Sequence, residues 1–428
     1  MISVGRILVA STPVYGHLGP LTRIARALQD AGHEVVLLAG DTPGQGAEAP
    51  RRPPPASGRG SGSAPSARGT ARWRPRWIKG RDEILDTFVV PLRAQADAVA
   101  GLLHPVGRTP RFDAVVADVS FLGVQPLLAS CSPGLRPPVI GISVTPIMLP
   151  SQDCAPFGTA LRPWDGPAGR TRNRQTDWLL RNGPLRVVQA TIDTIAAGIG
   201  VGPGEITLFG AIARFDRVFQ LGLPELEYPR RELPAFVEFV GPLPASCGCG
   251  SHLILDQRKP VVHVTQGTLD NADPTRLLLP AIRALAGDEL TVIASTGGAD
   301  TAITSLGAHD HPGVQVVDFA CYCWLLPRTD LMITNGGYGG VQLAARDGVP
   351  LIVAGDTQDK AEVAARVAWS GIGLDLRSGR PRPRQIRNAV RRVLADRRCA
   401  LKSAALAASA AGLGDPMERI VAAVGAAL

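Results

Sequence analysis

The 428-residue chain lacks the features that mark membrane-embedded or disulfide-stapled proteins. No uncharged apolar run reaches the ~20 residues of a membrane helix without interruption by proline or glycine, and the N-terminus shows no secretory signal pattern. Seven cysteines are an odd number in a long chain, which disfavours a disulfide framework. We therefore expect a cytoplasmic protein without stable membrane insertion.

Lysine is scarce, and most of the chain carries no net positive charge. Only four of the 45 basic residues are lysine, and this bias toward Arg, Ala, Gly and Pro is typical of a GC-rich gene. Residues 46–81 hold nine basic side chains and one acidic one, a net charge of +8 that equals the value for the whole chain. Because the other 392 residues are neutral overall, the charge does not indicate a nucleic-acid partner.

Large aliphatic residues are missing from one segment. Between Ala39 and Trp77 there is no Val, Leu, Ile, Met, Phe or Tyr, so this text cannot bury enough apolar surface to offset the entropy of ordering it. We predict disorder across the anomalous residues 46–81. The Arg, Pro, Gly, Ala and Ser text also suggests two compensating frameshifts or a sequencing error, a hypothesis that resequencing the locus would test.

The remaining text alternates between strand and helix patterns in two blocks, which predicts an α/β protein. In the first block, strands are expected at 7–10, 35–38, 114–117 and 139–144, with a helix at about 18–31. In the second, strands are expected at 261–264, 291–294, 314–317, 331–334 and 351–353, with helices at about 274–286 and 340–347. The tail from about Cys399 is helical by periodicity.

Pro/Gly-rich text at 241–244 separates the two blocks, so we expect two Rossmann-like domains facing a central cleft. The predicted bounds are 1–240 for the first domain, 241–407 for the second, and 408–428 for a C-terminal helix.

Two polar residues lie where strands of the first block end. His17 follows the first strand, at the sheet edge where open α/β folds bind ligands, and its pKa near neutrality suits a general base. Asp118 follows the strand at 114–117, where a carboxylate could orient His17. From these residues alone, a histidine with local hydrogen bonds and an aspartate in a helix cap or surface loop are the more ordinary interpretations.

Glycine-rich turns follow two strands of the second block. Because glycine has no side chain, its backbone N–H group can approach an anion closely, and a helix N-terminus adds a favourable dipole. We therefore expect a diphosphate to bind at these turns. A flexible turn is the alternative. The candidate residues are Gly267 and Thr268 after one strand, and Asn335, Gly336, Gly337, Tyr338, Gly339 and Gly340 after another.

A third polar stretch, from Gly355 to Glu362, follows the strand at 351–353. Its Asp359 and Lys360 suit a hydroxyl-rich ligand such as a sugar, because carboxylates accept hydrogen bonds from hydroxyl groups. A solvated helix start is the alternative, since acidic residues also favour a helix N-terminus.

Taken together, the motifs resemble the family 1 glycosyltransferases of GT-B fold, specifically the bacterial macrolide and antibiotic type. The resemblance covers nearly the whole chain except roughly 45–77. It is carried by the stretches GHLGPLTRIARALQDAGHEV, FVGPLP, VVHVTQGT and LLPRTDLMITNGGYGGVQLAARDGVPLIVAGDTQDKAEVAARV.

The resemblance implies inverting transfer of a sugar from a UDP- or dTDP-sugar to a small lipophilic acceptor in antibiotic biosynthesis and secondary metabolism. On that basis His17 is the base and Asp118 supports it, Phe319 stacks on the nucleotide base, and Asp359 and Lys360 contact the sugar. The donor is a co-substrate, so no resident cofactor is expected. The absence of any D-x-D motif agrees with a metal-independent reaction. We expect a monomer or a homodimer.

The chain departs from the family pattern at four places. Asn335 replaces the usual His before the paired glycines, Lys360 replaces the Gln of the sugar-binding pair, and Leu343 replaces a Glu that contacts the ribose. The segment 45–77 replaces ordinary aliphatic text on the acceptor side. The first three concern the identity of the donor more than the class of reaction.

Other functions remain open at this stage. The disrupted acceptor region favours a catalytically impaired protein that binds nucleotide sugars without turnover. Other GT-B activities, such as a sugar-nucleotide epimerase or a lipid-linked sugar transferase, would require different acid and base residues. A nucleic-acid-binding arm, with Trp73 and Trp77 to stack on bases, is the least favoured because the segment lies inside a domain.

Overall fold

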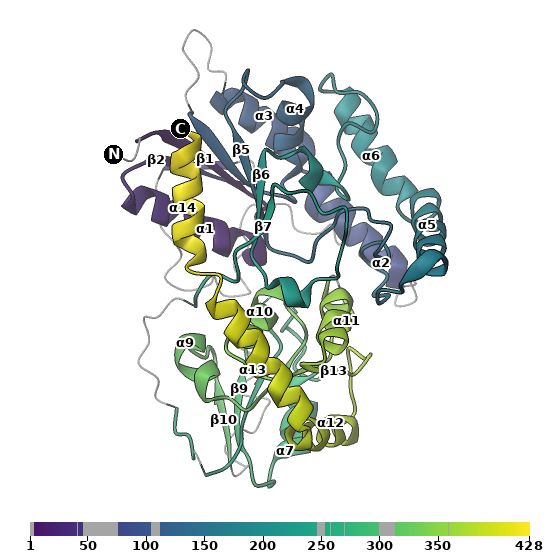
Figure 1. Cartoon of the computed structure of the whole chain (residues 1–428), viewed down its shortest axis with the longest axis vertical. Coiled ribbons are helices and arrows are strands. Elements are labelled where there is room, and N and C mark those ends of the chain that lie inside the picture. The colour runs from purple at the N-terminus through teal and green to yellow at the C-terminus, as the bar shows by residue number, and fades with distance from the viewer. Residues whose placement is uncertain are drawn as a thin grey trace.

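The computed structural model consists of two sheets, each covered by helices and arranged along the long axis of the molecule (Figure 1). It describes residues 4–40, 42–45, 76–103, 112–245, 253–256, 258–268, 270–298, 313–357 and 359–428, with the backbone alone at 42–45 and 76–79. We refer to the part built on the first sheet as the first domain and to the part built on the second sheet as the second domain.

The first sheet has seven strands in the order β3-β2-β1-β4-β5-β6-β7. Six of them run parallel, and β3 is antiparallel to β2. The strands are β1 (Arg6–Ser11), β2 (Glu34–Ala39), β3 (Thr42–Gln45), β4 (Ala114–Asp118), β5 (Val139–Ser143), β6 (Arg217–Gln220) and β7 (Val237–Phe239).

The second sheet has six parallel strands in the order β10-β9-β8-β11-β12-β13. They are β8 (Val261–Thr265), β9 (Thr291–Ser295), β10 (Val314–Val317), β11 (Leu331–Thr334), β12 (Leu351–Val353) and β13 (Gly373–Asp375). The expectation of an α/β chain with two Rossmann-like sheets is confirmed.

Helices connect most of the neighbouring parallel strands that the structure describes, since a parallel pair needs a crossover connection of about a dozen or more residues. The helices of the first domain are α1 (Tyr15–Asp30), α2 (Arg76–Ile84), α3 (Leu92–Leu103), α4 (Gln125–Ser130), α5 (Gly166–Asn182) and α6 (Arg186–Ala197). Those that follow are α7 (Leu278–Leu285), α9 (Tyr322–Leu325), α10 (Tyr338–Arg346), α11 (Lys360–Ser370), α12 (Pro383–Ala395), α13 (Arg397–Ala411) and α14 (Pro416–Ala427).

Helix α1 shows how the sequence pattern produces the first core. Its buried residues Leu21, Ile24 and Leu28 recur at helical spacing and pack against β1. Each fully buried side chain of this size contributes roughly 1.5–3 kcal/mol relative to exposure. The helix begins at Tyr15, earlier than predicted, which places His17 in its first turn.

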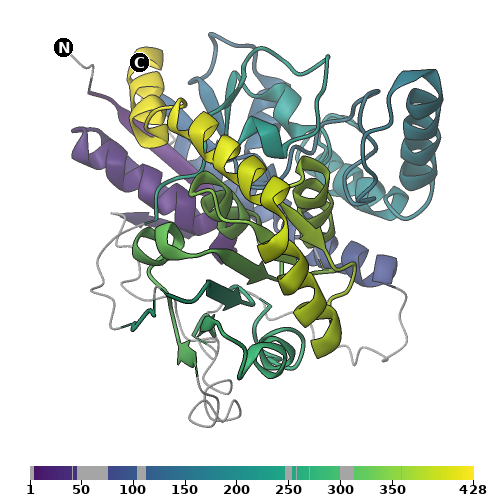
Figure 2. The ribbon, with the colours of Figure 1, turned by 60° about the horizontal axis from the view of Figure 1, so that its bottom comes forward.

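The C-terminal helix α14 leaves the second domain and packs on the first. Its residues Ile420 and Val424 belong to the same apolar cluster as Leu21 and Ile24 of α1. Figures 1 and 2 show α13 lying along the second domain and α14 continuing across to the first, where the two chain ends lie close together. The predicted crossing of the C-terminal helix is confirmed, while the exact domain bounds of 240 and 407 stay a prediction.

The prediction of disorder across 46–81 is wrong for its last six residues. Helix α2 begins at Arg76 and runs into a π-helical turn at Leu85–Val89. Apolar residues of this turn, including Phe88 and Val89, join a cluster with Ile192 of α6 and so hold the helix in place. Residues 46–75 lie outside the described residues.

Several elements carry little sequence signal and were not predicted. The short strands β6, β7 and β13 have three or four residues each, too few for a clear period-2 pattern. Helices α5 and α6 lie at the periphery of the first domain (Figure 1). Within the described residues, none of the helices combines the length and apolar character needed to cross a membrane.

Candidate active site

Each sheet has a topological switch point, where neighbouring strands have crossovers on opposite faces. In the first sheet this point lies between β1 and β4, and in the second between β8 and β11. Ligands in open α/β folds bind beyond the carboxyl ends of the strands at such points. The residues that follow these four strands therefore define the candidate site.

His17 and Asp118 meet at the switch point of the first sheet. His17 follows β1, Asp118 ends β4, and the His17 Nδ1 to Asp118 Oδ2 distance is 2.9 Å. Asp118 is fully buried and its other oxygen accepts a hydrogen bond from the Ser120 backbone N–H at 3.0 Å. When Nδ1–H donates to Asp118, Nε2 is left as the proton acceptor, the arrangement a general base requires.

The pKa of both partners is shifted in the direction that stabilises the charged pair. Burial lowers the pKa of His17, but the charge and hydrogen bond of Asp118 outweigh burial, so the pKa lies above its ordinary value of 6.5. Burial raises the pKa of Asp118, but the interactions with His17 and Ser120 lower it by more. The pKa of Asp118 therefore lies below its ordinary value. Asp118 therefore stays ionised and supports a protonated imidazole.

The charge of Asp359 in the second domain also reaches His17. Asp359 raises the pKa of His17, and His17 in turn opposes the effect of burial on Asp359, whose pKa is raised. Asp359 follows β12 and is the N-cap residue of α11. The charge of the predicted sugar-binding residue of the second domain therefore acts on the His–Asp pair of the first domain.

Two glycine-containing loops meet at the switch point of the second sheet. Gly267, after β8, has φ +75° and lies so close to Asn335, after β11, that an added Cβ would be 3.4 Å from Asn335 Oδ1. Asn335 is buried and donates from Nδ2 to the Gln266 carbonyl. Its Oδ1 has no hydrogen-bond partner within the described part of the chain.

The side chain of Asn335 thus joins the two loops. The N–H groups of Gly267 and Gly336 donate to the hydroxyls of Thr265 and Thr334, so the N–H groups in the first turn of α10 are the main backbone donors for a diphosphate.

Gly336 is required by the backbone at the start of this second loop. It has φ +92°, and a Cβ there would lie 2.7 Å from Val353 Cγ1. Gly337 is the N-cap of α10, and Gly339 and Gly340 lie in the first turn of that helix, so the loop presents a helix N-terminus at the switch point. This is the geometry by which backbone N–H groups bind anions.

Tyr338 is turned toward the first domain. Its hydroxyl accepts a hydrogen bond of 2.7 Å from Gln220 Nε2 at the end of β6, and burial raises its pKa far above the ordinary range. The neighbouring Gln342 accepts from the Leu223 backbone N–H at 2.9 Å. The structure gives Tyr338 a contact between domains, and its role in donor binding stays a prediction.

Phe319 and Thr268 are accessible. Phe319 is 47% exposed in the loop after β10, and its ring packs over Gly298, where a Cβ would lie 2.8 Å from Phe319 Cζ. Thr268 is exposed beside Gly267. An exposed aromatic face beside the sheet edge can stack on a planar base. Gly298 was not predicted to be part of the site, although a Gly-Gly dipeptide after a strand could have indicated it.

Lys360 belongs to a network of charges at the same edge. It is only 4% exposed, and its Nζ lies 4.0 Å from Asp270 Oδ2. Asp270 also pairs with Arg276 at 2.5 Å, and Arg276 pairs with Asp356 at 3.0 Å. Asp270 and Arg276 were not predicted, because the spacing of the β8 loop gives no indication that it approaches the β12 loop.

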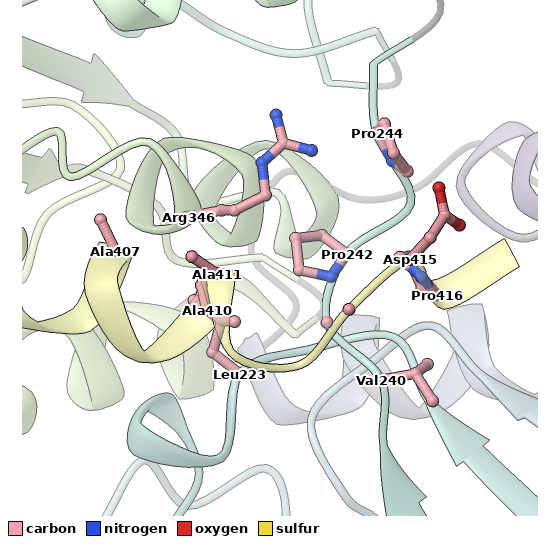
Figure 3. Close-up of a pocket in the computed structure, with 12 residues that line it drawn as sticks. Leu223, Val240, Pro242, Pro244, Arg346, Ala407, Ala410, Ala411, Asp415 and Pro416 are labelled. Atoms are coloured by element: carbon pink, nitrogen blue, oxygen red, sulfur yellow. The ribbon is translucent and has the colours of Figure 1, made fainter. Parts of the chain in front are cut away.

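A cavity of about 400 Å³ lies away from these residues, behind the junction of the domains. Figure 3 shows Pro242 and Pro244 of the linker on one side, and Ala407, Ala410 and Ala411 of α13 on the other. None of the predicted site residues lines it. The cavity marks the place where the linker and the returning C-terminal segment pass each other.

The structure adds a buried charged cluster that sequence analysis missed. Arg366 of α11 lies between Glu227 of the first domain and Glu362 of α11, with N–O distances of 2.6 Å to each. The i,i+4 spacing of Glu362 and Arg366 was a readable signal. Nothing in the sequence indicates Glu227 as their partner.

Among the described residues, no group of three or more His, Cys, Asp or Glu side chains has the arrangement of a metal site. The site as described contains a buried His–Asp pair, a helix N-terminus with backbone N–H groups, an exposed aromatic ring and a carboxylate from the second domain.

Two Rossmann-like sheets, with a buried His–Asp pair at one switch point and a glycine-rich loop and helix N-terminus at the other, are the architecture of the GT-B class of glycosyltransferases. Comparison with known proteins agrees. Residues 291–426 match the family model described as the C-terminal domain of proteins like erythromycin biosynthesis protein CIII. The chain is 37% identical to 4'-demethylrebeccamycin synthase of Lentzea aerocolonigenes, with 94% of each chain covered.

The chain is also 31% identical to UDP-glycosyltransferase 2 of Phaeomoniella chlamydospora, over 91% of this chain and 89% of that one. Its fold is similar to the solved glycosyltransferase of kitacinnamycin, with TM-score 0.69, 19% identity and full coverage of both chains. The calicheamicin glycosyltransferase CalG4 gives TM-score 0.68 at 19% identity, covering 99% and 98% of the two chains. The chain therefore belongs to the family 1 glycosyltransferases of GT-B fold, of the antibiotic type.

Proposed function

We propose that this glycosyltransferase moves a sugar, with inversion and without a metal, from a nucleoside-diphosphate sugar to a small lipophilic natural product. The observation that carries the proposal is the buried His17–Asp118 pair at 2.9 Å, with Asp359 of the second domain within electrostatic reach. This pair can take the proton of an acceptor hydroxyl as the hydroxyl attacks the anomeric carbon. Relatives named for rebeccamycin synthesis and for UDP-dependent transfer support the substrate classes.

In the proposed reaction His17 Nε2 accepts the hydroxyl proton, and Asp118 stabilises the imidazolium that forms. The acceptor oxygen bonds to the anomeric carbon from the face opposite the diphosphate, and the bond from that carbon to the diphosphate oxygen breaks. The growing negative charge is stabilised by N–H groups of the Gly267–Thr268 loop and of the α10 N-terminus. Asp359 accepts hydrogen bonds from sugar hydroxyls, and Phe319 stacks on the base.

Several finer features of the proposal rest on the sequence and the family. The absence of D-x-D supports a reaction without a metal-held diphosphate. Asn335 and Lys360, which replace residues of the family pattern, concern the choice between UDP and dTDP and the choice of sugar. We also propose a cytoplasmic location, a function in antibiotic biosynthesis, and a monomer or homodimer.

A donor-by-acceptor screen, read by mass spectrometry, tests the proposal. The wild-type chain is incubated with UDP- and dTDP-sugars and a panel of lipophilic hydroxylated aglycones, beside His17→Ala. We expect a glycosylated product with the wild type and a loss of about 10²–10⁴-fold in the variant, the range of general base catalysis. Full activity of His17→Ala would remove His17 as the base.

The alternative function, nucleotide-sugar binding without turnover, has a distinct outcome in the same experiment. It is favoured by the aliphatic-free text between Ala39 and Trp77, which replaces part of the acceptor side in the family pattern. Donor binding measured by calorimetry with no product from any acceptor would support it. Product formation by the wild type would exclude it.

A further inference from the structure

We propose that Glu362 is a positioning residue that holds residues 156–161, the far part of the loop 144–165, as a wall of the acceptor site, so that acceptor recognition depends on both domains. This inference rests on the proposed function of the His17–Asp118 site. It concerns a residue of α11 in the second domain and a loop of the first domain that are 200 residues apart in sequence and in direct contact.

The loop begins beside the proposed base. Strand β5 pairs with β4, so that Asp118 lies opposite Ile142, and the chain leaves β5 after Ser143. The connection to α5 then runs through residues 144–165 with no further strand or helix. A segment that leaves the sheet next to Asp118, at its carboxyl edge, is placed to border a substrate that reaches His17.

Glu362 anchors the far part of this loop. Its Oε1 accepts hydrogen bonds from the backbone N–H of Gly158 at 2.8 Å and of Ala160 at 2.6 Å. Ala160 has φ +52°, a conformation that residues other than glycine rarely adopt, so the local chain does not favour this geometry on its own. Two charge-assisted hydrogen bonds to one carboxylate oxygen supply the external constraint.

The anchor is itself fixed from the other side. Arg366 donates from Nη1 to Glu362 Oε2 at 2.6 Å, and pairs through Nη2 with Glu227 Oε1 at the same distance. Glu227 Oε2 accepts from the backbone N–H of Ile147, at the near end of the same loop, at 2.9 Å. The loop is therefore held at two points by two buried glutamates, which one arginine joins.

This arrangement connects the loop to the donor side. Glu362 lies in the first turn of α11, two residues after Lys360 and three after Asp359, the proposed sugar-binding pair. A displacement of α11 relative to the first domain would move the anchor of the loop by the same amount. The position of this wall beside the acceptor is thus set by the position of the second domain.

The first test compares steady-state kinetics of the full-length wild type with Glu362→Ala and Glu362→Gln. We expect Glu362→Ala to raise the acceptor KM by about tenfold or more, as the loss of two hydrogen bonds to a charged group implies, with the donor KM within about twofold. Gln keeps an oxygen for the two N–H groups but turns its amide NH2 toward the Arg366 guanidinium, so Glu362→Gln should recover only part of the acceptor KM. Glu289→Ala, at a glutamate whose side chain is 91% exposed, is the matched control.

Equal changes in the two KM values, a loss confined to kcat, or no change in Glu362→Ala would overturn the inference. If the wild type itself transfers no sugar to any acceptor, the proposed function has failed, and the kinetic arm does not apply.

The second test does not depend on activity. Amide hydrogen exchange of the peptide that contains Gly158 and Ala160 is measured in the substrate-free proteins. We expect exchange about tenfold faster or more in Glu362→Ala, and intermediate protection in Glu362→Gln, whose amide NH2 faces the Arg366 guanidinium. If Glu362→Ala does not fold, Glu362→Asp, which keeps the charge but shortens the side chain, should show the same faster exchange. Unchanged protection in these variants would show that Glu362 does not hold the loop.

Discussion

The two sides of the site are built in different ways. On the first domain, His17 and Asp118 come from neighbouring strands of one sheet, and their 2.9 Å contact is fixed by strand pairing. On the second domain, Asp359 and Lys360 begin α11, whose contacts extend into the first domain through Glu362 and Arg366. The geometry of the base therefore belongs to one domain, whereas the geometry of the sugar-binding pair relative to the acceptor depends on how both domains are joined.

The difference also appears in the residues themselves. The first side keeps the His and Asp that the family pattern leads one to expect, whereas the second side has Asn335 and Lys360 in place of the usual residues. Substitutions are tolerated where backbone N–H groups and a helix N-terminus supply most of the donors, since these do not depend on side-chain identity. A general base has no such replacement.

The largest expected effect is on the first side. Asp118→Asn keeps the shape of the side chain but removes the charge that supports the imidazolium, so we expect kcat to fall by about 10²–10⁴-fold. Donor affinity, measured by calorimetry, should be unchanged, because the residues proposed to bind the donor lie on the second domain. A fall in donor affinity comparable to the fall in kcat would show that the two sides are not independent.

The next largest effect is expected at the buried ion-pair cluster of Glu227, Glu362 and Arg366, which connects the two domains. Arg366→Ala leaves the buried Glu227 and Glu362 without their shared cation, and we expect a loss of about 3–5 kcal/mol in the free energy of unfolding. Chemical denaturation measures this value.

Arg181→Ala is the matched control, because its ion pair with Asp177 is exposed and should contribute less than about 1 kcal/mol. Equal losses of unfolding free energy in the two arginine variants would contradict a special contribution of this ion-pair cluster to stability.

The pH dependence of activity should follow the titration of His17 on the first domain. His17 acts as a base only when neutral, and its pKa lies above 6.5, so kcat/KM should rise with pH through that raised value. The same shift makes His17 contribute to stability below its unfolded pKa, a contribution that is lost as pH rises through the folded pKa. Activity should therefore increase over the pH range in which this part of the stability disappears.

Asp118→Asn should move the rising limb of the pH profile to lower pH, because burial then dominates the pKa of His17. Lys360→Gln on the second domain should leave the limb in place. A shift of the limb in the Lys360 variant alone would assign it to a group on the second domain.

The smallest effect is expected from the substitutions on the second side. Lys360→Gln restores the residue usual in the family, and we expect a change of about fivefold or less in the ratio of kcat/KM between two donor sugars, as the exchange of one polar contact for another would give. Acceptor KM should not change. A larger effect on acceptor than on donor would show that Lys360 faces the acceptor.

The sequence predicted the parts of the fold and site that local patterns encode. His17 and Asp118 were each identified by their position after a strand, and the structure adds that β1 and β4 are neighbours, which brings them together. The contact of Tyr338 with Gln220 could not be predicted, because a side chain at a helix N-terminus can point to either domain.

Contacts between the domains were the hardest to predict. Glu362 and Arg366 share a helix face and their pairing is readable from spacing, but Glu227 lies 139 residues away and joins them only through the docking of the domains. The helix at Arg76–Ile84 was missed for a different reason, since the basic, aliphatic-poor text before it made the whole segment look unable to fold.

The packing of α14 on the first domain has a consequence for how the protein folds during synthesis on the ribosome. The second domain has its last core residues, Leu406 and Ala410, before α14 begins, whereas the core of the first domain includes Ile420 and Val424. During synthesis, the apolar residues of α1 that contact α14 are made early. Helix α14 itself is made only after nearly 400 further residues. The first domain is therefore translated first but completes its core last. The apolar residues of α1 that α14 will cover are the surface at which a nascent chain of this protein would need protection from aggregation.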